Sequence, residues 1–265
     1  MAESKTAATP VPAATIVLLR DDPEEGLETF MVVRHHQIDF ASGALVFPGG
    51  KIDEQDADAE LAAYCDGAHA DPVMRAMQIG AIREAFEESG VLLARPAGSD
   101  ALIDGERLAT LETYRTTLHN GEVALKDFLQ RENLRLACDR LVHFAHWVTP
   151  DMMPKRFDTH FFIARAPEDH VLLHDGHESV DSVWIRPQQV LRDAASGHRT
   201  VIFPTLRNVE KLADSDSVDA AIEAAKAHPI VTVIPWTEKR DDGVWLRIPV
   251  EAGYRISEER MPARG

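Results

Sequence analysis

The first third of the chain alternates apolar runs with turn-forming residues, which predicts short strands. Ala14–Leu19 and Thr29–Val33 are apolar and rich in β-branched residues, and the polar stretch Asp21–Gly26 between them predicts a hairpin turn. Ala44–Phe47 is a third apolar run, which stops at the sequence Pro48-Gly49-Gly50. We therefore expect three strands before residue 50.

The clearest helical pattern lies between Asp71 and Gly90. Asp71 can cap the first turn, Pro72 is favoured at the first helical position, and Gly90 can end the helix. Apolar residues recur at helical spacing between these limits, at Val73, Met77, Ala81 and Ala85. The preceding residues 54–70 are alanine-rich and polar, with weak helical character and no clear buried stripe, so we expect a surface excursion there.

The rest of the chain predicts an irregular succession of helices and strands. Two amphipathic helices are expected near Glu106–Leu118 and Glu122–Asn133. Further expected elements are strands at Leu141–Val148, His160–Ala164 and Ser182–Ile185, helices at Gln188–Ala195, Thr205–Ala213 and Asp219–Ala227, and a terminal hairpin of Ile230–Ile234 with Val244–Ile248. The irregular alternation favours an α/β fold, in which helices cover a mixed sheet, over a regular doubly wound sheet.

Composition indicates a folded chain. Apolar residues make up 45% of the 265 residues and charged residues 27%, which excludes intrinsic disorder as the main description. The length exceeds that of an average domain but suits one domain with insertions. We expect a flexible lead-in over residues 1–12, rich in Ala, Thr and Pro, and a single domain over 13–258 with insertions near 54–71 and 97–140.

Charge and cysteine content narrow the classes of partner. The net charge of −16 disfavours a nucleic-acid partner but allows a small phosphorylated substrate bound by local cations. Cys65 and Cys138 cannot form a disulfide framework, and two free thiols fit a reducing compartment. The longest stretch without charged residues, Thr6–Leu19, is too short to span a bilayer and contains prolines. A soluble, cytoplasmic protein without a membrane partner is expected.

Three carboxylates near the end of the predicted helix indicate a metal site. Glu84, Glu87 and Glu88 are spaced i, i+3 and i+4, so they project from one helix face. They repel each other, and the helix macrodipole disfavours anions in the last turn. Either bulk water solvates them or a cation neutralises them. All-oxygen ligation favours magnesium or manganese over zinc, and Arg83, four residues before Glu87, can hold part of the cluster.

The glycines before this helix support the metal interpretation. A strand that ends in Gly49 and Gly50 lets the backbone approach an ion or a phosphate closely. A Gly-Gly turn alone is weak evidence because such turns are common. Combined with the three glutamates, it favours a site over a solvated acidic face.

These segments resemble the Nudix hydrolases, whose box is G-x5-E-x7-R-E-U-x-E-E-x-G-U, with U a bulky aliphatic residue. The matching positions are Gly50, Arg83, Glu84, Glu87, Glu88, Gly90 and Val91. Ala85 replaces the first aliphatic residue, and Asp56 stands where the box has its first glutamate. About 19 additional residues separate Gly50 from Arg83 compared with the uninterrupted box. No role is transferred to Asp56.

The interrupted box resembles one branch of that superfamily, the coenzyme A and acyl-coenzyme A diphosphatases related to the Nudix motif 19 protein. Segments outside the box share the resemblance: Arg34, Ser42–Gly50, Trp147–Pro150 and Pro154–Thr159. The similarity covers roughly residues 14–215. It implies a Nudix-type α/β/α sandwich with a mixed sheet and helical insertions.

The resemblance also implies an activity. The chain would hydrolyse a diphosphate linkage between a nucleoside and another moiety, with coenzyme A or acyl-coenzyme A as the first expectation. Two alternatives stay open: an ADP-ribose or dinucleotide pyrophosphatase, and a non-catalytic Nudix-fold module that binds nucleotides. Retention of all three glutamates speaks against the module.

The implied site uses both halves of the box. Mg²⁺ or Mn²⁺ would be held by Glu84, Glu87, Glu88 and a carbonyl of Gly49 or Gly50. Glu84 or the loop residue Glu178 would take a proton from the attacking water, and Arg83 would orient the cluster.

Cationic residues are the candidates for substrate binding. Lys155 and Arg156 follow Pro154 at the mouth of a strand, where they can meet a diphosphate, although surface solubility explains them nearly as well. Together with Arg34, they are candidates for a contact with the 3′-phosphate of coenzyme A. The expected partner is a small-molecule nucleotide, and a homodimer stays an open alternative.

Overall fold

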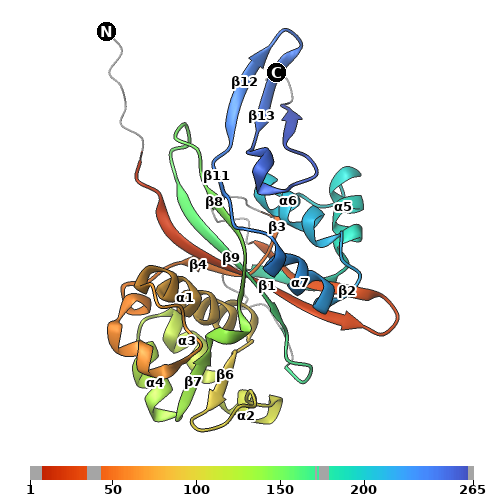
Figure 1. The fold of residues 1–265 in the computed structure, drawn as a ribbon. Coiled ribbons are helices and arrows are strands. Elements are labelled where there is room, and N and C mark those ends of the chain that lie inside the picture. Colours follow the sequence, from red (N-terminus) through yellow and green to blue (C-terminus); the bar gives the residue numbers. More distant parts are fainter. Residues whose placement is uncertain (1–7, 35–42, 171, 173–178, 262–265) are drawn as a thin grey trace.

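A mixed eight-stranded sheet forms the centre of the computed structural model, which describes residues 8–34, 43–170, 172 and 179–261. The strand order is β10-β2-β1-β9-β8-β11, with β3 paired to β2 and β4 to β1 (Figure 1). The strands are β1 Val11–Asp22, β2 Gly26–Arg34, β3 Leu45–Val46, β4 Gly49–Lys51, β8 Val142–Val148, β9 Phe157–Arg165, β10 Ser179–Ile185 and β11 Thr232–Val233. The β1–β9 and β8–β11 pairs are parallel and the other pairs antiparallel.

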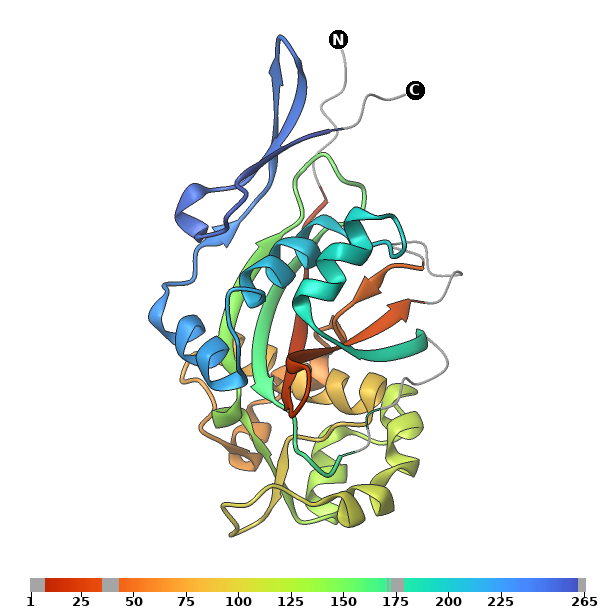
Figure 2. The same ribbon diagram turned by 90° about the vertical axis from the view of Figure 1, so that its right-hand side faces the viewer.

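Helices cover both faces of this sheet (Figures 1 and 2). Alternate residues of β1 point to opposite faces, so Ile16 and Leu18 pack in one core and Val17 and Leu19 in the other. The first core contains α1 (Pro72–Ser89), and the second contains residues of α5 (Pro187–Ala195), α6 (Phe203–Leu212) and α7 (Val218–Ala227). The predicted α/β sandwich with a mixed sheet is confirmed.

Helix α1 begins and ends where the sequence predicts. The Asp71 side chain accepts a hydrogen bond of 2.8 Å from the Val73 amide, and Pro72 is the first helical residue. Gly90 ends the helix at φ 73°, a left-handed conformation that glycine adopts without strain. The box residues therefore lie on a helix with fixed ends.

Residues 54–66 contribute to the interior, so the expectation of a mere surface excursion is wrong. They form two 3₁₀ helices, η1 (Glu54–Ala57) and η2 (Ala59–Tyr64), followed by β5 (Cys65–Asp66). Asp56 and Leu61 are each only 1% exposed. Because each short turn buries a single residue, no periodic stripe appears in the sequence.

The segment between residues 94 and 140 is more divided than the sequence predicts. Its elements are β6 Ala94–Pro96, α2 Gly105–Leu111, α3 Thr113–His119, α4 Leu125–Arg131, β7 Leu134–Ala137 and η3 Cys138–Arg140. The single helix expected near Glu106–Leu118 is two helices, and β7 was not expected. Strands β5, β7 and β6 form a separate small sheet. Cys65 and Cys138 are buried free thiols, as expected.

The second strand of the C-terminal hairpin lies where the sequence predicts, but the first strand lies further along the chain. Residues 232–233 form β11, which pairs in parallel with β8 rather than with Val244–Ile248. The hairpin consists of β12 (Trp236–Arg240) and β13 (Gly243–Arg247), and β14 (Glu258–Arg260) follows η4 (Val250–Ala252). It extends away from the main sheet in both views (Figures 1 and 2). No helix in the described ranges is both long and apolar enough to cross a membrane.

Candidate active site

Arg83 connects the glycine loop to α1. Its guanidinium is buried and makes two hydrogen bonds to Asp56, from Nε at 3.0 Å and from Nη2 at 2.9 Å. Nη2 also donates to the Lys51 carbonyl at 2.9 Å. Burial alone would lower the pKa of Arg83, but the hydrogen bond to Asp56 and the charge of Glu84 outweigh it and raise the pKa. The guanidinium therefore stays charged.

The same guanidinium lies between two of the glutamates and donates hydrogen bonds to both. Nη1 donates to Glu84 Oε1 at 2.9 Å and to Glu87 Oε2 at 3.2 Å. The contact with Glu87 is the one that the i, i+4 spacing predicts. Arg83 thus reduces the repulsion between the carboxylates and fixes their positions.

Asp56, to which the sequence alone assigns no role, belongs to the site. It lies six residues after Gly50, where the box has its first glutamate, and its carboxylate pairs with Arg83. Position in the box was therefore a usable signal, even though the residue type differs and the insertion follows it. The shorter side chain also fits beside Gly80, where an added Cβ would lie 3.1 Å from Asp56 Oδ2.

Gly49 and Gly50 have no room for a side chain. Gly49 has φ 154°, and a Cβ there would lie 2.4 Å from the Ala14 carbonyl oxygen. A Cβ on Gly50 would lie 2.6 Å from Glu84 Oε1. The Gly49 amide donates a 2.7 Å hydrogen bond to Glu88 Oε2. The turn therefore lies directly against the carboxylates, as expected, and its amide orients one of them.

The donor set fits a hard divalent cation. Glu84, Glu87, Glu88, Gly49 and Gly50 line one cavity. Glu87 Oε1 is buried and has no hydrogen-bond partner among the described residues. Burial raises the pKa of Glu87 and outweighs the nearby charge of Arg83, so the protein alone only partly compensates the charged form. A magnesium or manganese ion held by the three carboxylates would supply that compensation.

Helix α3 reaches this site from the 97–140 segment. Arg115 donates from Nε and Nη2 to the Glu87 carbonyl at 3.3 and 3.2 Å, which satisfies the C-terminal end of α1. His119 Nδ1 lies 3.6 Å from Glu87 Oε2. No spacing in the sequence signals these contacts, because the tertiary fold alone brings α3 to α1.

The cavity has a volume of about 1150 Å³, and both charged and apolar residues line it. The carboxylates and Arg34 are polar lining residues. Apolar lining residues come from the β8–β9 loop and the C-terminal sheet, namely Met152, Met153, Leu246 and Met261. The cavity thus offers both charged and apolar surface to a ligand.

The three predicted substrate-binding cations all line this cavity. Arg156, however, is mostly buried: Nε donates to the Thr149 carbonyl at 2.9 Å and Nη2 pairs with Asp151 at 2.5 Å. Arg156 therefore holds the loop 149–156 in place, and Lys155 and Arg34 stay as substrate candidates. Glu178, the alternative base, lies outside the described residues.

Comparisons with known proteins show which family the chain resembles. The family model described as NUDT19 Nudix domain matches residues 64–212, more than half of the chain. The chain is 27% identical over 243 residues to the Acyl-coenzyme A diphosphatase NUDT19 of Homo sapiens and 25% identical over 218 residues to that of Xenopus laevis. These matches cover 75% and 67% of this chain, which spans only 64% and 57% of the length of these curated relatives.

A solved structure shares the fold. The crystal structure of a NUDIX hydrolase from Alicyclobacillus acidocaldarius aligns with a TM-score of 0.68 at 27% identity. The alignment covers 82% of this chain and 96% of that one. The likeness therefore includes nearly the whole of the bacterial protein.

Proposed function

Because the chain belongs to the NUDT19 Nudix domain family of Nudix hydrolases, we propose that it hydrolyses the diphosphate linkage of coenzyme A or acyl-coenzyme A. The observation that carries this proposal is the group of three α1 glutamates at one large cavity. The buried Glu87 Oε1 of this group has no hydrogen-bond partner within the part of the chain that the structure describes. Such a group suits a site that binds a divalent cation and a diphosphate together.

Different residues of the site would have different roles in the reaction. Glu84, Glu87 and Glu88 would hold Mg²⁺ or Mn²⁺, which when bound neutralises diphosphate charge and increases the acidity of water. Arg83 keeps Glu84 and Glu87 apart, and the Gly49 amide fixes Glu88. Glu84 or Glu178 would accept the proton of the attacking water.

The mixed lining of the cavity supports a substrate with a charged and an apolar part. Arg34 and Lys155 can neutralise phosphate groups, while the methionines offer an adaptable apolar surface. An acyl-coenzyme A has this division, whereas ADP-ribose is polar at both ends. A cytoplasmic location and a homodimer stay predictions.

A substrate screen tests the proposal. The protein is incubated with Mg²⁺ or Mn²⁺ and one of four substrates: coenzyme A, acyl-coenzyme A of several chain lengths, ADP-ribose or NADH. The kcat/KM for each substrate is compared with that of two control variants, Glu87→Gln and Glu88→Gln. We expect the highest kcat/KM for coenzyme A or an acyl derivative. Faster hydrolysis of ADP-ribose would contradict the proposed substrate but would leave the assignment as a diphosphate hydrolase intact. Binding of nucleotides without any hydrolysis would support the non-catalytic module instead.

A further inference from the structure

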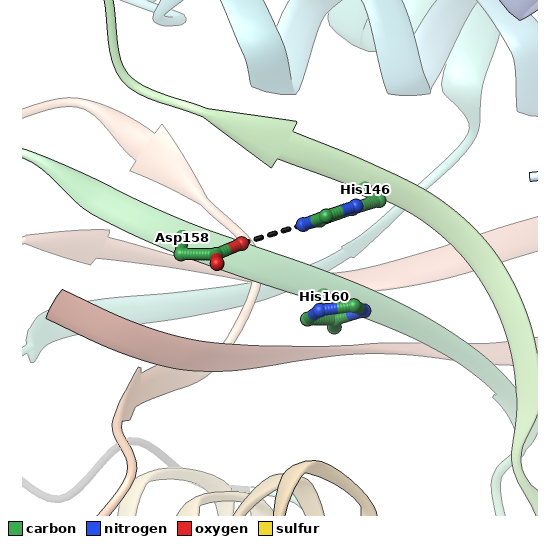
Figure 3. A group of neighbouring side chains, drawn as sticks. All are labelled: His146, Asp158 and His160. Atoms are coloured by element: carbon green, nitrogen blue, oxygen red, sulfur yellow. Dashed lines mark hydrogen bonds and ion pairs between the residues drawn. The ribbon is translucent and has the colours of Figure 1, made fainter. Parts of the chain in front are cut away.

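A second cluster of potential metal ligands lies outside the glutamate cavity, on β8 and β9. His146 on β8 stands directly opposite His160 on β9, and Asp158 lies two residues before His160 (Figure 3). One ligand atom from each of the three side chains lies within 4.8 Å of the others. Residues i and i+2 of one strand, with the opposite residue of its neighbour, form a compact triangle on one sheet face.

The cluster and the cavity lie on opposite faces of β9. Phe157, Thr159 and Phe161 line the cavity. Strand alternation turns Asp158 and His160 to the other face, which is the face of the α1 core. His146, Asp158 and His160 do not line this cavity, so the cluster is not an extension of the glutamate site.

Both histidines have an outer partner on Nδ1. His146 Nδ1 lies 2.8 Å from Thr232 Oγ1, and His160 Nδ1 lies 3.0 Å from His143 Nε2. Metal-binding histidines characteristically use one nitrogen for such a partner and the other for the metal. When each Nδ1 donates its proton outward, each Nε2 keeps a free lone pair.

Access from solvent also suits a ligand site. The side chains of His146 and Asp158 are 17% and 39% exposed. An ion can therefore reach the cluster from solvent without opening the core.

We propose that His146, Asp158 and His160 form a second metal site, which binds a transition metal of the zinc class. Two imidazoles and one carboxylate are a ligand set that zinc accepts, with water completing the coordination. The all-oxygen glutamate group prefers magnesium or manganese, so the two sites select different ions.

Binding requires a defined local change. Without metal, His146 Nε2 lies 2.5 Å from Asp158 Oδ1, and the rings of His146 and His160 stack at 4.0 Å between centroids. Stacked rings cannot both direct lone pairs at one ion, so the more exposed His146 ring must turn. The Thr232 hydroxyl serves both states, because it can donate to His146 Nδ1 without metal and accept from it with metal.

The site lies at the base of the loop that carries Lys155. This loop, residues 149–156, joins β8 to β9, and His146 and Asp158 stand just outside its two ends. A bound ion would therefore link both ends of the loop on the face opposite to the substrate cavity.

Cobalt spectroscopy tests the site without relying on activity. Metal-free protein is titrated with Co²⁺ in millimolar Mg²⁺, which occupies the glutamate group. We expect one equivalent of Co²⁺ with the visible absorption of low-coordinate cobalt, displaced by Zn²⁺. Asp158→Asn and His146→Gln should abolish this absorption, and Thr232→Val should weaken binding about 10- to 100-fold. His228→Gln, on an exposed histidine elsewhere, should leave it unchanged.

Two further measurements distinguish binding at this cluster from binding at the glutamate group and from misfolding of the variants. Zn²⁺ should raise the melting temperature of the wild-type protein but not that of the Asp158→Asn variant. Because Asp158 is partly exposed, misfolding of the variant would not explain this difference. Glu87→Gln should retain the cobalt absorption. Absence of a stoichiometric cobalt complex, or a complex that survives Asp158→Asn and His146→Gln, would overturn the proposal.

Discussion

Asp56 and Arg83 are the most consequential pair at the scale of single residues. Both residues are buried. The Asp56 carboxylate accepts two hydrogen bonds from the Arg83 guanidinium. Removal of one partner of a buried ion pair leaves an uncompensated charge. The pair therefore controls stability and site geometry together.

Asp56→Asn should reduce the free energy of unfolding by about 3–5 kcal/mol, because Arg83 loses its buried counter-charge. Urea unfolding measures this change. Asp53 is a matched control, since it lies 3.8 Å from Arg83 Nη2 and is 53% exposed. Asp53→Asn should cost no more than about 1 kcal/mol. Equal effects of the two substitutions would contradict the assignment.

Glu87→Gln should separate activity from stability. We expect hydrolysis to fall by about 100-fold or more, since the carboxylate that would hold the cation is lost. Stability in the presence of a chelator should hold or rise slightly, because burial disfavours the charge of Glu87. Initial rates at saturating Mg²⁺ and thermal melting with chelator provide the two readouts. Unchanged turnover would exclude Glu87 as a ligand.

At the scale of elements, patterns with several repeats were predictable and short elements were not. Helix α1 has four apolar repeats, a cap and a terminal glycine, and its bounds were correct. Strands β5 and β11 have two residues each, and their pairing depends on distant partners. Sequence patterns therefore predicted the position of the glutamate helix. They did not predict that α3 packs against it and brings Arg115 and His119 to Glu87.

Helix η2 should be structural despite its polar sequence. Leu61→Ala should lower the free energy of unfolding by about 2–4 kcal/mol, because the side chain is 1% exposed in the α1 core. Val73 on α1 is 61% exposed and provides a control, since Val73→Ala should change stability by less than about 0.5 kcal/mol. A Leu61→Ala protein as stable as the control would restore the view of residues 54–66 as a surface excursion.

At the scale of the whole molecule, the cavity is a property of the tertiary fold. Its lining comes from segments as distant as β2, the 149–156 loop and the C-terminal sheet. Local motifs predicted its carboxylates, because the box residues are recognisable in the sequence. The contribution of Leu246 on β13 and of Met261 after β14 had no sequence signal, since the tertiary fold brings these residues to the cavity.

The 3′-phosphate of coenzyme A provides a test at this scale. A chain of net charge −16 must bind that phosphate with local cations, and Arg34 and Lys155 line the cavity. Removing the 3′-phosphate should lower kcat/KM by about 10- to 100-fold. Arg34→Ala or Lys155→Ala should erase this discrimination while sparing the dephosphorylated substrate. Equal kcat/KM for both substrates in the wild-type protein would argue against the contact.

The connection of Asp56 to Arg83 through space has a consequence for how such motifs are recognised. Hydrogen bonds from Arg83 to Asp56 and to the Lys51 carbonyl, and from the Gly49 amide to Glu88, hold the two parts of the box together without a fixed number of intervening residues. Chain length between these two positions is consequently free to vary during evolution, provided that both ends return to the same contact. A search pattern written as one contiguous string will overlook homologues with long interruptions, whereas a pattern written as two linked half-motifs will recover them.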